Sequence, residues 1–317
     1  MNGEQPKIEI FEPFGAAFEL MKKILFQPFD FAKWLVIGFA AFLSGAWGNG
    51  FSFRSPKGDW NFRSVSYNNT SISESLPHWF FPLIGVIVVS ALVIILVLMW
   101  ISSRGRFIFT DCVVKNRAAI TAPWREYRRE GNSFFLFSLA LMFLTLLFMA
   151  VLVFLILLPM GVFSGGKGIA GLGAGAMFAL ILVGFVWLVL AIFIAVVSQF
   201  MIPVMYRRRC RAREAFFDVS KLVLARPGPI ILFVLFGIVL VLALVIVSTL
   251  AACMTCCIAA FPYISSVVLL PALVWLLVFK LLFLRQFGPQ YDVWATEDSA
   301  LPAAPIAPPE VPPAPME

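Results

Sequence analysis

The chain has 317 residues, of which 61% are apolar and 13% are charged, and its mean hydropathy is +0.95. Soluble proteins carry about 25% charged residues, so this composition lies outside the soluble class. The formal net charge is +7, but the basic residues lie beside apolar runs and not on a polar domain. This distribution favours a membrane-orientation signal and contact with anionic lipid, and it argues against nucleic-acid binding.

The first amphipathic segment covers residues 15–27, after a short polar N-terminal segment at residues 1–13 that we expect in the cytoplasm. Its apolar residues follow helical spacing: Ala17, Phe18, Met21, Ile24 and Leu25. A second such segment covers residues 211–225 and precedes the breaker Pro227-Gly228-Pro229. Both patterns predict helices in the membrane interface, with Phe18, Met21, Phe216 and Val219 facing the acyl chains.

Six apolar runs are the dominant feature of the remaining sequence, and about 20 helical residues cross a hydrocarbon core of roughly 30 Å. They cover residues 31–47, 79–101, 134–158, 177–204, 230–252 and 264–284. We therefore predict an all-α polytopic membrane protein with six transmembrane helices, formed by a membrane domain at residues 14–287. The Pro- and Ala-rich residues 288–317 are predicted to be a disordered cytoplasmic tail, as a spacer or a partner-docking segment.

The Lys and Arg residues are distributed unevenly between the two sides of this six-span arrangement. Of the 24 basic residues, 20 fall on the side of both termini and only Arg54, Lys57, Arg63 and Lys167 on the other. Short loops rich in Lys and Arg stay in the cytoplasm. The sequence therefore predicts a multi-pass protein of the cell (plasma or inner) membrane with both termini cytoplasmic.

A short pattern is repeated in the chain. The sequence Phe18-Glu19-x-x-Lys22-x-x-Leu25-x-x-Pro28 recurs as Phe217-Asp218-x-x-Lys221-x-x-Leu224-x-x-Pro227. Each copy precedes an apolar run, which predicts a parallel internal repeat of one surface helix and one transmembrane hairpin. Asp111 and Lys115 suggest a diverged third copy in the central loop.

The central segment 104–133 carries a set of polar and aromatic residues that points to a family. These residues are Arg104, Gly105, Arg106, Phe107, Asp111, Asn116, Arg117, Trp124, Arg125, Tyr127, Arg128, Gly131, Asn132 and Ser133. With the surface-helix and hairpin plan, the chain resembles uncharacterised six-span bacterial membrane proteins. In organisation these are similar to the membrane domain of some glycerophosphodiester phosphodiesterases. The resemblance implies a location and a layout, and it implies no catalytic residue.

The candidate chemical motifs are weak. His78 has no Ser or Cys partner near it in sequence, and the Gly-rich residues 159–175 fail the phosphate-loop pattern at Gly168. The middle of each apolar run lacks ionisable residues, and its hydroxyl groups are expected to bond to backbone or neighbouring helices. Cys253, Cys256 and Cys257 could bind copper(I) or form a disulfide, but helix packing is the favoured interpretation.

Three classes of function stay open: a non-catalytic scaffold or accessory protein, a transporter or lipid-handling protein without an ion-coupling site, and a membrane enzyme. The sequence favours the first, with no catalytic residue, cofactor or metal site and with membrane lipids as partners. Each Lys or Arg near an anionic leaflet contributes about 1 kcal/mol, so clustered arginines favour contact with anionic headgroups. We expect this contact from Arg125, Arg128, Arg129, Arg207, Arg208, Arg209 and Arg211.

Overall fold

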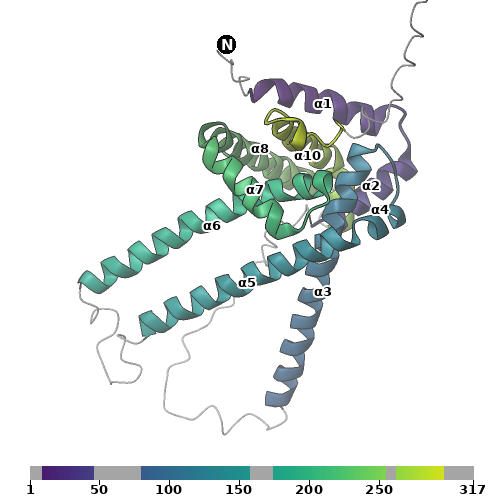
Figure 1. Cartoon of the computed structure of the whole chain (residues 1–317). Helices are drawn as coiled ribbons and strands as arrows, with labels where there is room; N and C mark the ends of the chain where they lie inside the picture. Colours follow the sequence, from purple (N-terminus) through teal and green to yellow (C-terminus); the bar gives the residue numbers. More distant parts are fainter. Residues whose placement is uncertain (1–8, 46–79, 158–173, 255–261, 296–317) are drawn as a thin grey trace, which may run out of the picture.

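The computed structural model describes residues 9–45, 80–157, 174–254 and 262–295, and these ranges contain helices and no strand (Figure 1). The helices are α1 (Phe11–Phe26), α2 (Phe31–Leu43), α3 (Phe80–Val114), α4 (Thr121–Glu126), α5 (Arg128–Leu157), α6 (Ala174–Arg208), α7 (Ala212–Ala225), α8 (Pro227–Met254), α9 (Pro262–Val268) and α10 (Leu270–Arg285). A short 3₁₀ turn, Pro289–Tyr291, follows α10. The predicted all-α class is confirmed.

Four of the six apolar runs form helices long and apolar enough to cross a membrane. These are α3, α5, α6 and α8, which contain the predicted second to fifth runs. Their apolar side chains are largely exposed, as a lipid-facing helix requires, since the bilayer supplies the apolar surroundings. The composition therefore identified these elements correctly.

The first and last runs differ from the prediction, so the described residues contain four candidate spans and not six. The helix α2 has 13 residues, which is about 20 Å of helix. The last run is divided at Leu269 into α9 and α10. Proline lacks an N–H group and clashes with the preceding turn, so a new helix begins at the position before Pro271.

The predicted central loop is shorter than expected. The helix α3 continues past residue 101 to Val114, and α5 begins at Arg128, before residue 134. Charged residues such as Arg are good helix formers, so leaving the apolar run does not end the helix. Asp111 therefore lies inside α3 and Lys115 directly after it, and neither belongs to a surface helix. The suggested third repeat copy was wrong at this position.

The two amphipathic helices bury their apolar sides against protein. In α1, Ala17, Met21, Ile24 and Leu25 are buried, and in α7, Ala212, Ala215, Val219 and Val223. The helix α1 lies along α10, where Trp275 Nε1 donates a hydrogen bond to the Phe14 carbonyl at 3.3 Å. The expectation that Met21 and Val219 face acyl chains was wrong, because both are buried against protein. Of the other two residues expected there, Phe18 is exposed and Phe216 is half-buried.

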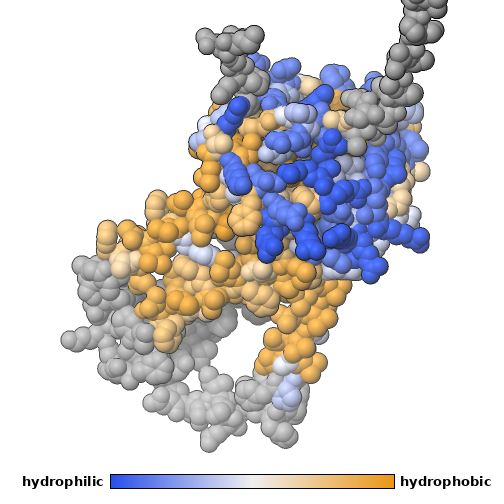
Figure 2. Space-filling view, viewed as in Figure 1, coloured by the Kyte–Doolittle hydropathy of each residue, from blue (hydrophilic) through white to orange (hydrophobic). Residues whose placement is uncertain are grey.

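Burial changes abruptly along the long helices. Most side chains of α3 are buried from Ser103 onward, and most of those of α6 from Val197 to Tyr206, while the other halves of both helices are largely exposed. In α5, Phe134 is buried and the residues after it are largely exposed. Hydrophilic residues cover the end of the molecule where burial is high, and hydrophobic residues cover the projecting parts of α3, α5 and α6 (Figure 2). We call the first region the polar end; its interior is a helical core that includes Phe107, Met201 and Phe283.

The crossing of α2 and α3 generates a first prediction. A Cβ on Gly105 would overlap the Leu43 carbonyl group, whereas a Cβ on Gly184 in α6 would meet open space. Overpacking costs about 1–3 kcal/mol, so Gly105→Ala should lower the thermal unfolding temperature of the purified protein. The control Gly184→Ala should leave it unchanged or raise it slightly, because Ala is the better helix former. Equal behaviour of the two variants would contradict the close crossing.

Candidate functional site

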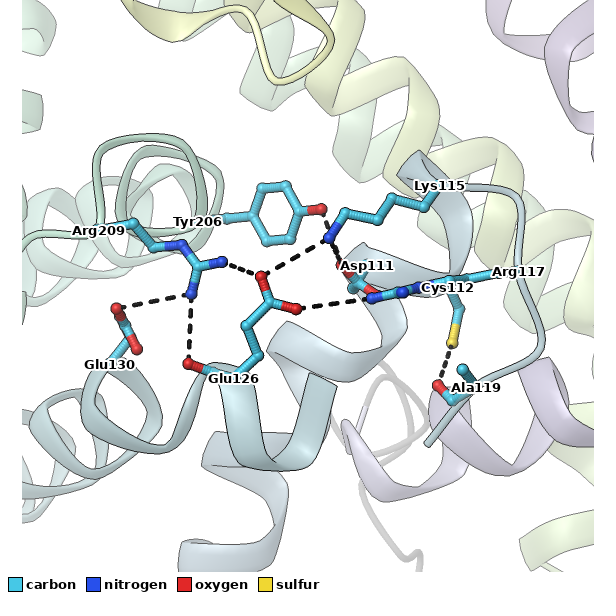
Figure 3. A network of polar contacts seen from close by, with 9 residues as sticks. All are labelled: Asp111, Cys112, Lys115, Arg117, Ala119, Glu126, Glu130, Tyr206 and Arg209. Atoms are coloured by element: carbon cyan, nitrogen blue, oxygen red, sulfur yellow. Dashed lines mark hydrogen bonds and ion pairs between the residues drawn. The ribbon is translucent and has the colours of Figure 1, made fainter. Parts of the chain in front are cut away.

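A buried carboxylate organises the polar end. The Asp111 side chain is fully buried, accepts three hydrogen bonds and forms an ion pair with Lys115 (Figure 3). Arg117 donates from Nη2 and Nε to Oδ2 at 2.7 and 2.9 Å. Tyr206 donates its hydroxyl to Oδ1 at 3.0 Å, and Lys115 Nζ lies 3.0 Å from the same oxygen. Because an unpaired buried charge is costly, this cluster fixes the end of α3 against the end of α6.

A second carboxylate extends the cluster toward α5. Glu126 pairs with Arg209, whose Nη1 also donates to the Glu126 carbonyl at 3.3 Å. The Arg209 guanidinium lies 3.8 Å from the centre of the Tyr127 ring and 3.8 Å from Glu130 Oε1. Arg209 is the first residue after α6, so these contacts connect the end of α6 to α4 and to the first turn of α5.

The aromatic residues beneath this cluster form a stack. The rings of Tyr127 and Tyr206 are stacked with their centres 4.9 Å apart. The Phe107 ring is also stacked with Tyr127, at a centre-to-centre distance of 6.0 Å. Burial raises the pKa of Tyr127 to about 12, so its phenol is neutral at physiological pH. The stack therefore supplies packing and hydrogen bonds and not a base.

Arg104 is enclosed by side chains from α3, α4 and α5. Its guanidinium lies 4.3 Å from the Trp100 ring centre and 5.1 Å from that of Trp124. It donates to Asn132 Oδ1 from Nη2 at 2.8 Å and from Nε at 3.2 Å. Arg104, Trp124 and Asn132 of the central segment are thus explained by internal contacts between α3, α4 and α5.

A groove of about 310 Å³ opens between the start of α5 and the α6–α7 junction. Its lining comprises Arg129, Glu130 and Ser133 from α5, and Arg209, Cys210, Arg211 and Glu214 from the junction and α7. Ser133 Oγ accepts the Ala212 N–H at 3.0 Å, which caps the α7 N-terminus from another helix. This bond fixes α7 on α5 and so sets the spacing of the two walls.

Glu130 is the unusual member of the groove. The residue is only 7% exposed, and its Oε2 has no hydrogen-bond partner among the residues that the structure describes. Buried carboxylate oxygens are normally satisfied by donors. The groove therefore presents an acceptor as well as positive charge.

The seven arginines predicted to contact lipid fall into different environments. Arg129, Arg209 and Arg211 line the groove together. Arg208 pairs with Asp218, and Arg207 is half-buried. Arg125, Arg128, Arg129 and Arg211 are exposed and have no carboxylate partner within the described ranges.

The family of the chain is known from comparison with family models. The model of a family of unknown function, DUF7544, matches residues 8–294. The chain belongs to the DUF7544 family. No curated protein and no solved structure matches it, and the comparisons give no link to the membrane domain of glycerophosphodiester phosphodiesterases.

Glu130 and Ser133 were not identified as groove residues from the sequence of this DUF7544 protein. Glu130 and Ser133 are three residues apart, which places them on one helical face just before an apolar run. That spacing was the available signal. Their position opposite Arg211 and Glu214 depends on a contact between segments about 80 residues apart, which periodicity does not reveal.

The remaining candidate residues contribute no site within the described ranges. Cys253 is exposed, Cys256 and Cys257 lie outside those ranges with His78 and Gly168, and no group of three metal-binding side chains occurs inside them. Intrahelical hydrogen bonds to backbone carbonyls are confirmed for Ser90, Thr145, Ser198, Ser248 and Thr249.

The buried cluster generates a second prediction. Asp111→Asn removes the charge that Lys115 and Arg117 share, and loss of one partner from a buried ion pair costs about 3–5 kcal/mol. The variant should show a large fall in thermal stability. The control Asp218→Asn breaks a partly exposed pair with Arg208, worth about 0–1 kcal/mol, and should change stability little. A small effect at Asp111 would show that the cluster does not hold α3 and α6 together.

Proposed function

We propose that this protein is a non-catalytic, multi-pass protein of the cell membrane whose polar end binds anionic phospholipid headgroups, and that this contact supports the positioning or assembly of a membrane complex. The observation that carries the proposal is the convergence of Arg129, Arg209 and Arg211, from two distant chain segments, on one groove. Two of the helices that adjoin this groove, α5 and α6, are apolar and long enough to cross a membrane.

The charge distribution supports contact with lipid. Arg125, Arg128, Arg129 and Arg211 are exposed, and their charges are not neutralised by a carboxylate among the described side chains. Each contributes about 1 kcal/mol near an anionic leaflet, and the attraction decays over a Debye length of about 8 Å. Four such charges at one end of the molecule retain headgroups there without a deep pocket.

The proposed topology places this polar end in the cytoplasm with both termini. At the two ends of the described chain, the Glu9 N–H donates to Gln286 Oε1 at 2.9 Å and Gln286 Nε2 donates to the Glu9 carbonyl at 2.8 Å. Lys33 at the start of α2 donates to Asn116 after α3 at 2.6 Å. These contacts bring together chain segments for which the basic residues predict a cytoplasmic position.

We retain six spans and the repeat as parts of this proposal. The helices α2 and α9 pack together, with Trp34 Nε1 donating to the Val267 carbonyl at 3.0 Å and Tyr263 donating to the Leu35 carbonyl at 3.3 Å. Such a pair is the arrangement expected of a first and a last segment that enter the bilayer side by side. Both four and six spans leave the two termini on one side.

The lipid contact is tested by neutralising two exposed groove arginines. Arg129→Gln with Arg211→Gln should lower the amount of co-purified anionic phospholipid and weaken binding of phosphatidylglycerol roughly tenfold or more, since two charges are lost. The control pair Lys23→Gln and Lys221→Gln removes the same charge from exposed sites of α1 and α7 that do not line the groove. It should leave binding near the original value.

Both variants must first show unchanged membrane orientation in reporter fusions. No lipid loss in either pair would restrict the arginines to a role in orientation during insertion. Equal loss in both pairs would show a general charge effect and not binding at the groove. Turnover of a substrate by the purified protein would overturn the non-catalytic assignment.

A further inference from the structure

The groove contains negative as well as positive charge, which a purely anionic ligand would not require. Glu130 is buried in the wall of the groove with Oε2 unpartnered, and Glu214 lies on the opposite wall. A ligand with only a phosphate would satisfy Arg129 and Arg211 and leave Glu130 Oε2 without a donor. Leaving a buried charged acceptor unsatisfied is costly, so the favoured ligand supplies a donor as well.

The existing cation near Glu130 does not remove this requirement. Arg209 Nη1 lies 3.8 Å from Glu130 Oε1, which is beyond hydrogen-bond distance, and the same guanidinium is held by Glu126. Oε2 itself has almost no exposed surface, so a group that enters the groove reaches the Glu130 carboxylate when this side chain turns slightly toward it. A primary ammonium group has three N–H donors and a positive charge, which match this acceptor.

The surroundings of the groove favour a lipid over a free small molecule. On α5, Leu136 follows Ser133 by about one helical turn and is 63% exposed. On α7, Phe217 follows Glu214 by about one turn and is 58% exposed. Exposed apolar side chains thus adjoin the groove on both walls, where acyl chains attached to a bound headgroup would pack.

We infer that the groove binds a phospholipid headgroup that carries a primary ammonium beside its phosphate. The phosphate pairs with Arg129 and Arg211, and the ammonium donates to Glu130. This inference rests on the proposed lipid contact and adds one feature to it: the phosphate is the anionic group that the arginines bind, and the primary ammonium gives the headgroup a positive charge as well. A quaternary trimethylammonium has the same charge and no N–H, so it cannot satisfy Glu130 Oε2 in this way.

The test compares two lipids that differ only in those N–H groups. Full-length protein in detergent is titrated with phosphatidylethanolamine and phosphatidylcholine of identical acyl chains, and bound lipid is counted by native mass spectrometry. We expect about a tenfold preference for phosphatidylethanolamine, because one charge-assisted hydrogen bond distinguishes the two lipids. Glu130→Gln should remove most of this preference, while the exposed Glu19→Gln on α1 should retain it.

Three outcomes separate this inference from the proposed function. Equal binding of the two lipids, or an unchanged preference in Glu130→Gln, would overturn the inference even if Arg129 and Arg211 still retain phosphatidylglycerol. Competition by soluble phosphoethanolamine at lipid-like concentrations would overturn the assignment to a lipid. Unchanged phosphatidylglycerol binding after the double substitution Arg129→Gln and Arg211→Gln would instead overturn the broader proposal. If Glu130→Gln unfolds, Glu214→Gln on the exposed wall provides the second comparison, and it too should reduce the preference.

Discussion

The constraint on which the polar end depends is the burial of the Asp111 carboxylate. A buried carboxylate is tolerated only when it is paired and hydrogen-bonded, and the donors to Asp111 come from the segment after α3 and from α6. The α3 end, its following turn and the α6 end must therefore assemble together. Arg209 follows one turn after Tyr206 and reaches Glu126 and Glu130, so the cluster also positions the α6–α7 junction over α5.

This assembly divides the arginines of the polar end into two groups. Arg104, Arg117 and Arg209 are held by aromatic rings, an amide or carboxylates, and they stabilise the contacts between helices. Arg129 and Arg211 are exposed on the walls of a groove that the first group builds. The density of basic residues in the sequence thus combines arginines that hold the helices together with arginines that are free for the proposed contact with headgroups.

The sequence allowed good prediction of the elements that depend on local composition. The runs that became α3, α5, α6 and α8 are long and uniformly apolar, so length and hydropathy suffice to locate them. The division of the last run at Leu269 was missed because the run is continuously apolar, and the effect of Pro271 on the helix was not considered. The apolar sides of α1 and α7 were identified, but an amphipathic pattern does not distinguish a lipid surface from a protein core, and here α10 and α6 cover them.

The groove was less predictable because it is made by tertiary contacts. The arginines were selected for density along the chain, and density gives no information on which of them meet in space. The sequence treated Arg208 and Arg211 alike, whereas one pairs with Asp218 and the other lies open in the groove. Glu130 was not identified because a few acids in a basic segment are ordinary, and its significance comes only from burial of an oxygen without a donor.

We propose one lipid-facing groove at the boundary between the polar end and the bilayer. Electron cryomicroscopy of the full-length protein in lipid nanodiscs tests this placement most directly. We expect the bilayer edge to meet α5 near Leu136 and α7 near Phe217, with headgroup density between Arg129 and Arg211. A groove that lies clear of the bilayer, or one that is filled by protein side chains, would contradict it.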